Sequence, residues 1–192
     1  MKSHKNILKM TISALCLALA YVLPFLTGQI PKIGAMLLPM HIPVLLCGFL
    51  CGWQWGLGVG FIAPLLRSAT LGMPIFFPSA VCMALELATY GAACGLMHNL
   101  LPKKKPYIYV SLLTSMVFGR IIWGIAMAVC MGIKGNAYTF SAFLAGAVTN
   151  ALPGIAIQIL LIPVLVMVLE NQRFFKGLDN TSAKRLTARS AC

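Results

Sequence analysis

Residues 107–131 of the chain read YIYVSLLTSMVFGRIIWGIAMAVCM, an apolar run interrupted by one charged side chain, Arg120. A helix of about 20 apolar residues crosses the hydrocarbon core of a bilayer, so this run is long enough to span a membrane. Only helices and closed barrels satisfy the backbone hydrogen-bonding groups in lipid. The run does not alternate apolar with polar residues, which favours a helix over a barrel strand.

The composition of the whole chain points the same way. Of its 192 residues, 60% are hydrophobic and only 9% are charged, whereas soluble domains carry about 25% charged residues. Such a chain cannot cover itself with polar surface in water, and lipid is its expected solvent. We therefore predict an all-α, polytopic membrane protein.

Apolar segments of this kind recur along the chain and predict six transmembrane helices. The expected spans cover residues 7–26, 41–51, 56–69, 79–101, 107–131 and 141–169. The second and third spans are shorter than about 20 residues, so we expect this pair to tilt, kink or begin within the preceding loop. The prediction is one membrane domain, residues 1–170, followed by a basic cytoplasmic tail, residues 171–192.

The basic residues predict the orientation of the spans. The chain has 15 Lys and Arg against 3 Asp and Glu, a formal net charge of +12. The basic residues gather at the N-terminus, at residues 103–105 and after residue 172. A cytoplasmic N-terminus puts all three groups on the cytoplasmic side, so we predict an N-in, C-in topology. Because these groups flank apolar spans and lack interleaved aromatic residues, nucleic-acid binding is not expected.

Three charged residues, Arg67, Glu86 and Arg120, fall inside the predicted spans. A central charge costs roughly 2.5–3.5 kcal/mol on insertion scales, so each residue requires a partner or a function. The predicted topology puts all three in the middle or the outer half of the membrane. One interpretation is a binding site; the other is a structural bridge between Glu86 and Arg120.

Other side chains are expected near these charges. His41 and Asn150 lie towards the outer ends of their spans, and Tyr90 and Trp123 each lie one helical turn from one of the charges. Polar groups from several helices within an apolar wall are typical of a small-molecule site. The alternatives are an interfacial position for His41 and interhelical hydrogen bonds for Asn150 and Gln158.

The outer loops are expected at residues 27–40, 70–78 and 132–140. The first two are rich in Gly, Pro and large apolar side chains, Phe76 among them. They are interpreted either as lids over the site or as segments resting in the lipid interface. The candidate substrate-binding residues are therefore His41, Arg67, Phe76, Glu86, Tyr90, Arg120, Trp123 and Asn150.

Cations outnumber the single intramembrane acid, which favours a substrate with a carboxylate or another anionic group. The sequence has no G-x-x-x-x-G-K-[ST], H-E-x-x-H or G-x-S-x-G motif and no paired carboxylates on one span, so we expect no enzyme activity. Cys47 and Cys51 share a helix face without a His at ligand spacing, so neither a metal site nor a cofactor is expected.

Ala14 and Ala18 place two small side chains on one face of the first span, a pattern that allows close helix approach. With this face, the six-span basic chain resembles the substrate-binding S components of energy-coupling-factor (ECF) vitamin transporters. The segments LLPMHIPVLLCG (residues 37–48), WGLGVGF (55–61) and APLLRS (63–68) carry the resemblance, which extends over about residues 7–169.

The resemblance implies a mechanism in the bacterial cell membrane. An S component captures a micronutrient near the outer surface, and the loops at residues 27–40 and 70–78 correspond to the lids. The loaded subunit then topples against a transmembrane coupling subunit, and two cytoplasmic ATPases drive the cycle. Ala14 and Ala18 correspond to the contact with the coupling subunit.

The resemblance leaves the substrate open among B vitamins and related micronutrients. The segment around His41 and the excess of cations favour pantothenate, then folate, and a queuosine-type precursor is a further candidate. An autonomous secondary transporter or channel subunit for a small organic anion is the alternative function. An intramembrane enzyme, with Glu86 and His41 as the acid–base pair, is a third and less supported one.

Overall fold

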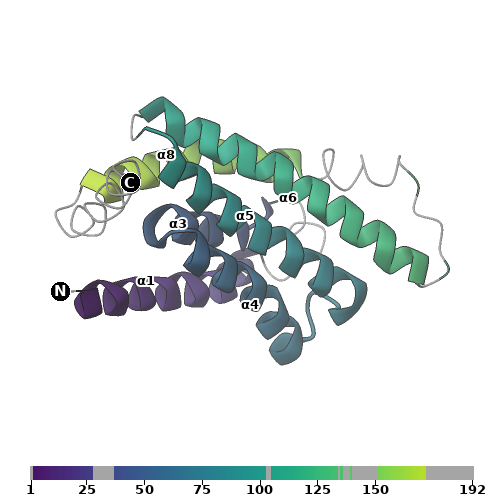
Figure 1. Ribbon diagram of the computed structural model, residues 1–192. Coiled ribbons are helices and arrows are strands. Elements are labelled where there is room, and N and C mark those ends of the chain that lie inside the picture. Colours follow the sequence, from purple (N-terminus) through teal and green to yellow (C-terminus); the bar gives the residue numbers. More distant parts are fainter. Residues whose placement is uncertain are drawn as a thin grey trace, which may run out of the picture.

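The computed structural model describes residues 2–27, 37–102, 105–133, 135, 139 and 151–171. The described chain is built from helices (Figure 1). They are α1 (Lys2–Val22), η1 (Leu23–Thr27), α3 (His41–Cys51), α4 (Trp53–Leu71), η2 (Phe76–Ala80), α5 (Val81–Leu100), α6 (Lys105–Ile133) and α8 (Leu152–Asn171). The prediction of an all-α chain is confirmed for this part.

The α-helices fall on the predicted spans, and α3 has the predicted bounds, residues 41–51. Segments at residues 6–25, 76–100, 105–133 and 152–169 are long and apolar enough to cross a membrane. The helices α3 and α4 do not meet that criterion. A membrane protein is therefore supported, whereas six spans and the N-in, C-in orientation stay predictions. Residues 141–150 of the last predicted span, loop residues 28–36 and the tail after residue 171 lie outside the described residues.

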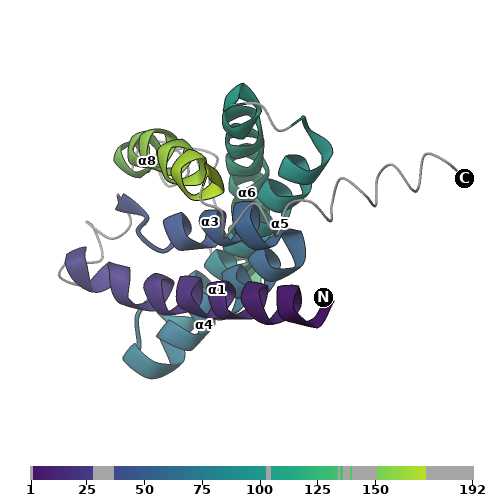
Figure 2. The same cartoon turned by 90° about the vertical axis from the view of Figure 1, so that its left-hand side faces the viewer.

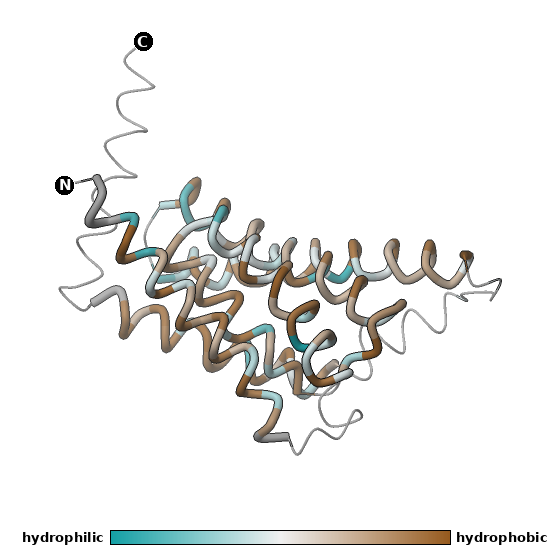
Figure 3. Tube along the Cα trace, turned by 90° about the horizontal axis from the view of Figure 1, so that it is seen from below, coloured by the Kyte–Doolittle hydropathy of each residue, from teal (hydrophilic) through white to brown (hydrophobic). Residues whose placement is uncertain are grey.

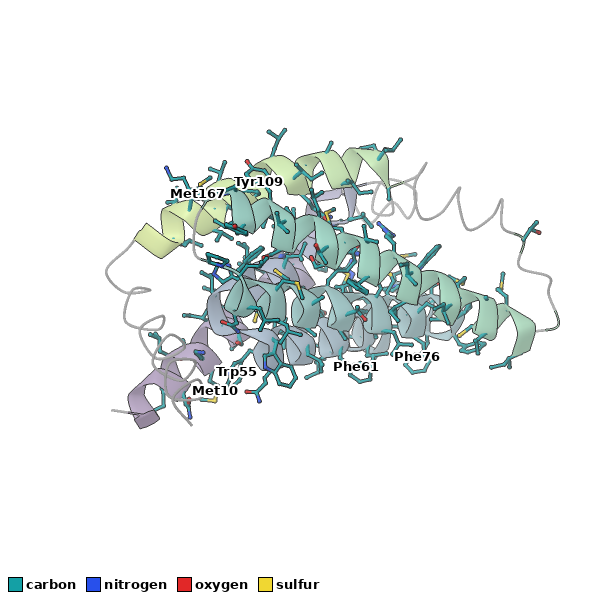
Figure 4. All side chains as sticks on the ribbon, turned by 45° about the horizontal axis from the view of Figure 1, so that its top comes forward. Met10, Trp55, Phe61, Phe76, Tyr109 and Met167 are labelled. Atoms are coloured by element: carbon teal, nitrogen blue, oxygen red, sulfur yellow. The ribbon has the colours of Figure 1, made fainter. Side chains whose placement is uncertain are left out.

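The distribution of polarity is the reverse of that in a soluble protein. Large apolar side chains are exposed along the long helices, and Figure 4 shows Phe61 and Phe76 pointing away from the bundle. The colours of Figure 3 show that hydrophobic residues predominate along these helices. The buried set includes polar and charged side chains, among them His41, Arg67, Glu86 and Gln158. An apolar exterior around buried polar groups is the arrangement that lipid favours.

The helix α5 lies at the centre of the bundle, packed against α3, α4 and α6. The helix α1 packs on α3 and α4, and α8 packs on α3 and α6. Figures 1 and 2 show α1 and α8 on opposite sides of α3. Side chains on α5 therefore have neighbours on several helices at once.

Glycines bring the backbones of α3, α4 and α5 into direct contact. A Cβ added at Gly48 would lie 2.6 Å from the carbonyl oxygen of Gly91, and one at Gly56 would lie 2.7 Å from the same oxygen. A Cβ at Gly60 would meet the backbone of Leu87, and one at Gly95 the backbone of Trp53. Small residues at helix interfaces permit this approach in membranes, where van der Waals packing drives association.

This packing predicts opposite effects for two glycines on α4. Gly60→Ala puts a methyl group into the Leu87 backbone, and we expect a loss of roughly 1–3 kcal/mol of stability from overpacking. Gly58 has no other atom within 4 Å of an added Cβ, so Gly58→Ala serves as the matched control. Thermal unfolding in one detergent should show a lower midpoint for Gly60→Ala only. Equal midpoints for the two variants would contradict the close contact.

Candidate functional site

Glu86 is the centre of a buried polar cluster. The side chain belongs to α5 and is 2% exposed. Its Oε1 atom lies 3.0 Å from Nη1 of Arg120 on α6 and 3.4 Å from Nε2 of His41 on α3. Three helices thus bring one acid and two basic residues together, an arrangement that both the predicted binding site and the alternative structural bridge require.

Tyr90 completes this cluster one turn further along α5. Its ring meets the His41 ring edge-on, with the centroids 5.1 Å apart, and its hydroxyl interacts with both Glu86 and Arg120. Gly119 makes room for the ring, because a Cβ there would lie 2.8 Å from Cε2 of Tyr90. Of the residues predicted from the sequence, the structure therefore groups His41, Glu86, Tyr90 and Arg120, which we call the Glu86 cluster.

Several polar atoms of the Glu86 cluster lack a hydrogen-bond partner within the described part of the chain. They are Nε and Nη2 of Arg120, both ring nitrogens of His41 and Oε1 of Glu86. The contacts of Glu86 Oε1 with His41 at 3.4 Å and with Arg120 at 3.0 Å are thus electrostatic contacts without hydrogen-bond geometry. Buried polar groups in native proteins are almost always paired, so these atoms are candidates for contacts with a bound substrate.

Arg67 lies in a different environment. Its Nη1 donates a hydrogen bond of 2.7 Å to the backbone oxygen of Tyr21, and the guanidinium carbon lies 5.0 Å from the centre of the Phe25 ring. Thr70 and Tyr21 share a further hydrogen bond of 3.1 Å between their hydroxyls. Arg67 thus connects the C-terminal end of α4 to the end of α1 and to η1, and none of these contacts joins it to Glu86.

The other predicted site residues lie outside the Glu86 cluster or beyond the described residues. Phe76 is 58% exposed at the start of η2. Trp123 is partly buried against the apolar cluster of Cys82, Ala126 and Cys130, on which Phe77 of the η2 segment also packs. Asn150 lies outside the described residues.

Two further buried positions, Gly119 beside the cluster and Gln158 on α8, were not predicted as site residues. Gly119 immediately precedes Arg120, and its role depends on the ring opposite it, so the sequence carries no direct signal. Gln158 on α8 is fully buried, and both of its amide atoms lack a hydrogen-bond partner in the described chain. An amide within an apolar run was a usable signal for Gln158.

The predicted partner-binding face of α1 is exposed in the described part of the chain. Ala14 and Ala18 are exposed, whereas Ile12, Cys16 and Ala20 on the opposite side pack into the core with α3 and α4. The small-residue face thus takes no part in the packing of the described bundle. Across the described residues, no group of three or more His, Cys, Asp or Glu side chains is arranged to hold a metal ion.

Comparison with known families identifies the chain. The family model for the ECF transporter substrate-specific component matches residues 8–166. Comparison with curated proteins and with solved structures gave no significant match. Members of this family are transport subunits that work with transmembrane and ATPase modules of an ECF transporter and bind a vitamin substrate. Since the match extends over most of its length, this chain belongs to the family of ECF transporter substrate-specific components.

Proposed function

We propose that the chain captures a carboxylate-bearing vitamin at the Glu86 cluster and passes it to an ECF importer in a bacterial cell membrane. Pantothenate is the first candidate and folate the second. The unpaired edge of the Arg120 guanidinium carries this proposal.

The Arg120 guanidinium is half used. Nη1 contacts Glu86 at 3.0 Å, while Nε and Nη2, which form the side edge of the group, have no hydrogen-bond partner among the described residues. Two parallel N–H donors on one edge match the two oxygens of a carboxylate. The contact with Glu86 holds the guanidinium in place, so a carboxylate would meet a preorganised donor pair at a small loss of conformational entropy.

The edge of Arg120 that would bind the carboxylate is buried. The Arg120 side chain is 13% exposed and those of His41 and Glu86 are nearly inaccessible, and the Nε and Nη2 atoms of Arg120 are buried as well. A ligand would therefore reach this edge only when neighbouring groups move aside, and Tyr90 and His41 would be the adjoining ring surfaces. The ring nitrogens of His41 offer further polar contacts to the hydroxyl and amide groups of pantothenate or to the heterocycle of folate.

The proposal includes the remaining expectations for the family. Six spans with both termini in the cytoplasm would put the Glu86 cluster in the outer half of the membrane, under the loops at residues 27–40 and 70–78. We propose these loops as the lids. The exposed face of Ala14 and Ala18 on α1 would contact the transmembrane coupling subunit, since small side chains allow close helix approach.

If Arg120 pairs with the substrate carboxylate, then removing either the guanidinium or the carboxylate should weaken binding. Arg120→Ala should weaken pantothenate binding by roughly 2–5 kcal/mol, because a desolvated charge pair loses one partner. Arg120→Lys should also weaken binding, since an ammonium group cannot form two parallel bonds. Panthenol, which carries an alcohol in place of the carboxylate, should bind weakly to the unsubstituted protein and be much less sensitive to Arg120→Ala.

Titration calorimetry on purified protein in nanodiscs would measure these affinities. Lys105→Gln removes an exposed cation from the first residue of the same helix and is the control for net charge. Folate replaces pantothenate in the same series if pantothenate fails to bind. Unchanged affinity of the carboxylate ligand in Arg120→Ala would contradict the proposed site.

The partner contact predicts a separation of binding from transport. Ala14→Leu combined with Ala18→Leu should leave ligand affinity of the purified subunit unchanged, because both side chains face away from the core. Uptake of the labelled vitamin by cells that also express the coupling subunit and the ATPases should fall strongly. Val117→Leu, at an exposed position of α6, is the control. Uptake at the control level in the double variant would contradict the contact.

A further inference from the structure

We propose that Cys82 and Cys130 form an oxidation site, at which two thiols become a disulfide that joins α5 to α6 beside the Glu86 cluster. The thiol of Cys82 donates to Sγ of Cys130 across 3.7 Å. The two residues are separated by 48 positions in the sequence, so the bundle itself brings them together. Both are free thiols in the structure.

The surroundings of this pair hold the two sulfur atoms against each other. Cys82 is 0% exposed and Cys130 is 7% exposed, and with Ala126 they form one apolar cluster. Cys94, by contrast, is a buried thiol whose sulfur contacts the backbone oxygen of Leu45 at 3.7 Å. The Cys82–Cys130 pair is thus positioned for a bond between helices, and Cys94 provides an internal comparison.

The location of the pair connects it with the site. Cys82 precedes Glu86 by four residues, which is about one helical turn of 5.4 Å on the same face of α5. Trp123 packs on the cysteine cluster and follows Arg120 by one turn of α6. A covalent bond here would therefore restrain the two helices that carry Glu86 and Arg120.

The same cluster also contacts the segment proposed as the second lid. Phe77 of η2 packs against Cys82, Ala126 and Cys130, together with Trp123 and Met127. In the proposed topology, α5 begins and α6 ends at the outer side of the membrane, where disulfides persist more readily than in the cytoplasm. A bond between Cys82 and Cys130 would thus act on the lid and on the substrate site together.

The chemistry is a two-electron oxidation. The two thiols lose two protons and two electrons and form one Sγ–Sγ bond, and the oxidant, a low-molecular-weight disulfide or diamide, accepts both. The sulfur atoms must approach by roughly 1.7 Å to reach the bonded distance of about 2.05 Å. Because burial in apolar surroundings disfavours the reactive thiolate, we expect a slow reaction that needs a small oxidant.

The first part of the test needs no vitamin. Full-length protein in nanodiscs is treated with diamide, the remaining thiols are alkylated under denaturing conditions, and the digest is analysed by mass spectrometry. The expected result is a linked peptide pair containing Cys82 and Cys130, with Cys94 alkylated. Cys82→Ala and Cys130→Ala should each abolish the link, and Cys94→Ala should retain it. Alanine avoids the buried unsatisfied hydroxyl that serine would introduce.

The second part rests on the proposed function. Oxidation should lower pantothenate affinity at least about tenfold, since a binding site must be held within roughly 0.5 Å of its productive geometry. Dithiothreitol should restore the affinity, and Cys130→Ala should be insensitive to diamide. If both Cys82 and Cys130 are still alkylated after diamide treatment, the proposed oxidation site is wrong. If the disulfide forms completely and pantothenate affinity is unchanged, the proposed effect on binding is wrong. Failure of the reduced protein to bind pantothenate or folate would overturn the proposed substrate and leave the test of the link intact.

Discussion

The ion pair between Glu86 and Arg120 is the interaction on which the rest of the arrangement depends. Two charges are held away from water inside a chain that is apolar on its outside, at a distance of 3.0 Å. In such surroundings the cost of desolvation is comparable to the attraction between the charges, so the pair by itself is weak support for stability. The pair acts instead by positioning, because it fixes where the Arg120 guanidinium of α6 lies relative to α3 and α5.

The helix packing makes that position possible. Glycines on α3, α4 and α5 remove the side chains that would separate the backbones, and α5 thereby becomes the element that the others surround. Gly119 removes one more side chain beside Arg120, where the Tyr90 ring fits. The polar cluster therefore depends on the glycine contacts. Because the helix backbones lie close together, charged side chains that are far apart in the sequence come into contact.

Much of this architecture could be predicted from the sequence, since apolar runs and isolated charges are properties of single segments. The bounds of α3 and the location of Glu86 and Arg120 inside the bundle belong to this class. The rotation of each helix about its axis depends on its neighbours. For that reason Arg67 could not be assigned to the Tyr21 and Phe25 contacts, and Phe77 could not be distinguished from Phe76 as the residue that packs inward. The glycines of α4 and α5 are small residues at helical spacing, as Ala14 and Ala18 are. This sequence pattern alone does not show whether such a face packs inside the bundle or lies on its surface.

The central claim is that the free edge of Arg120 receives a substrate carboxylate. The most direct measurement is an experimental structure of the protein with pantothenate bound, or with folate if that is the ligand that binds. We expect the carboxylate oxygens at about 2.7–2.9 Å from Nε and Nη2 of Arg120, with Nη1 still in contact with Glu86. A ligand bound away from Arg120, with that edge of the guanidinium still unpaired, would contradict it.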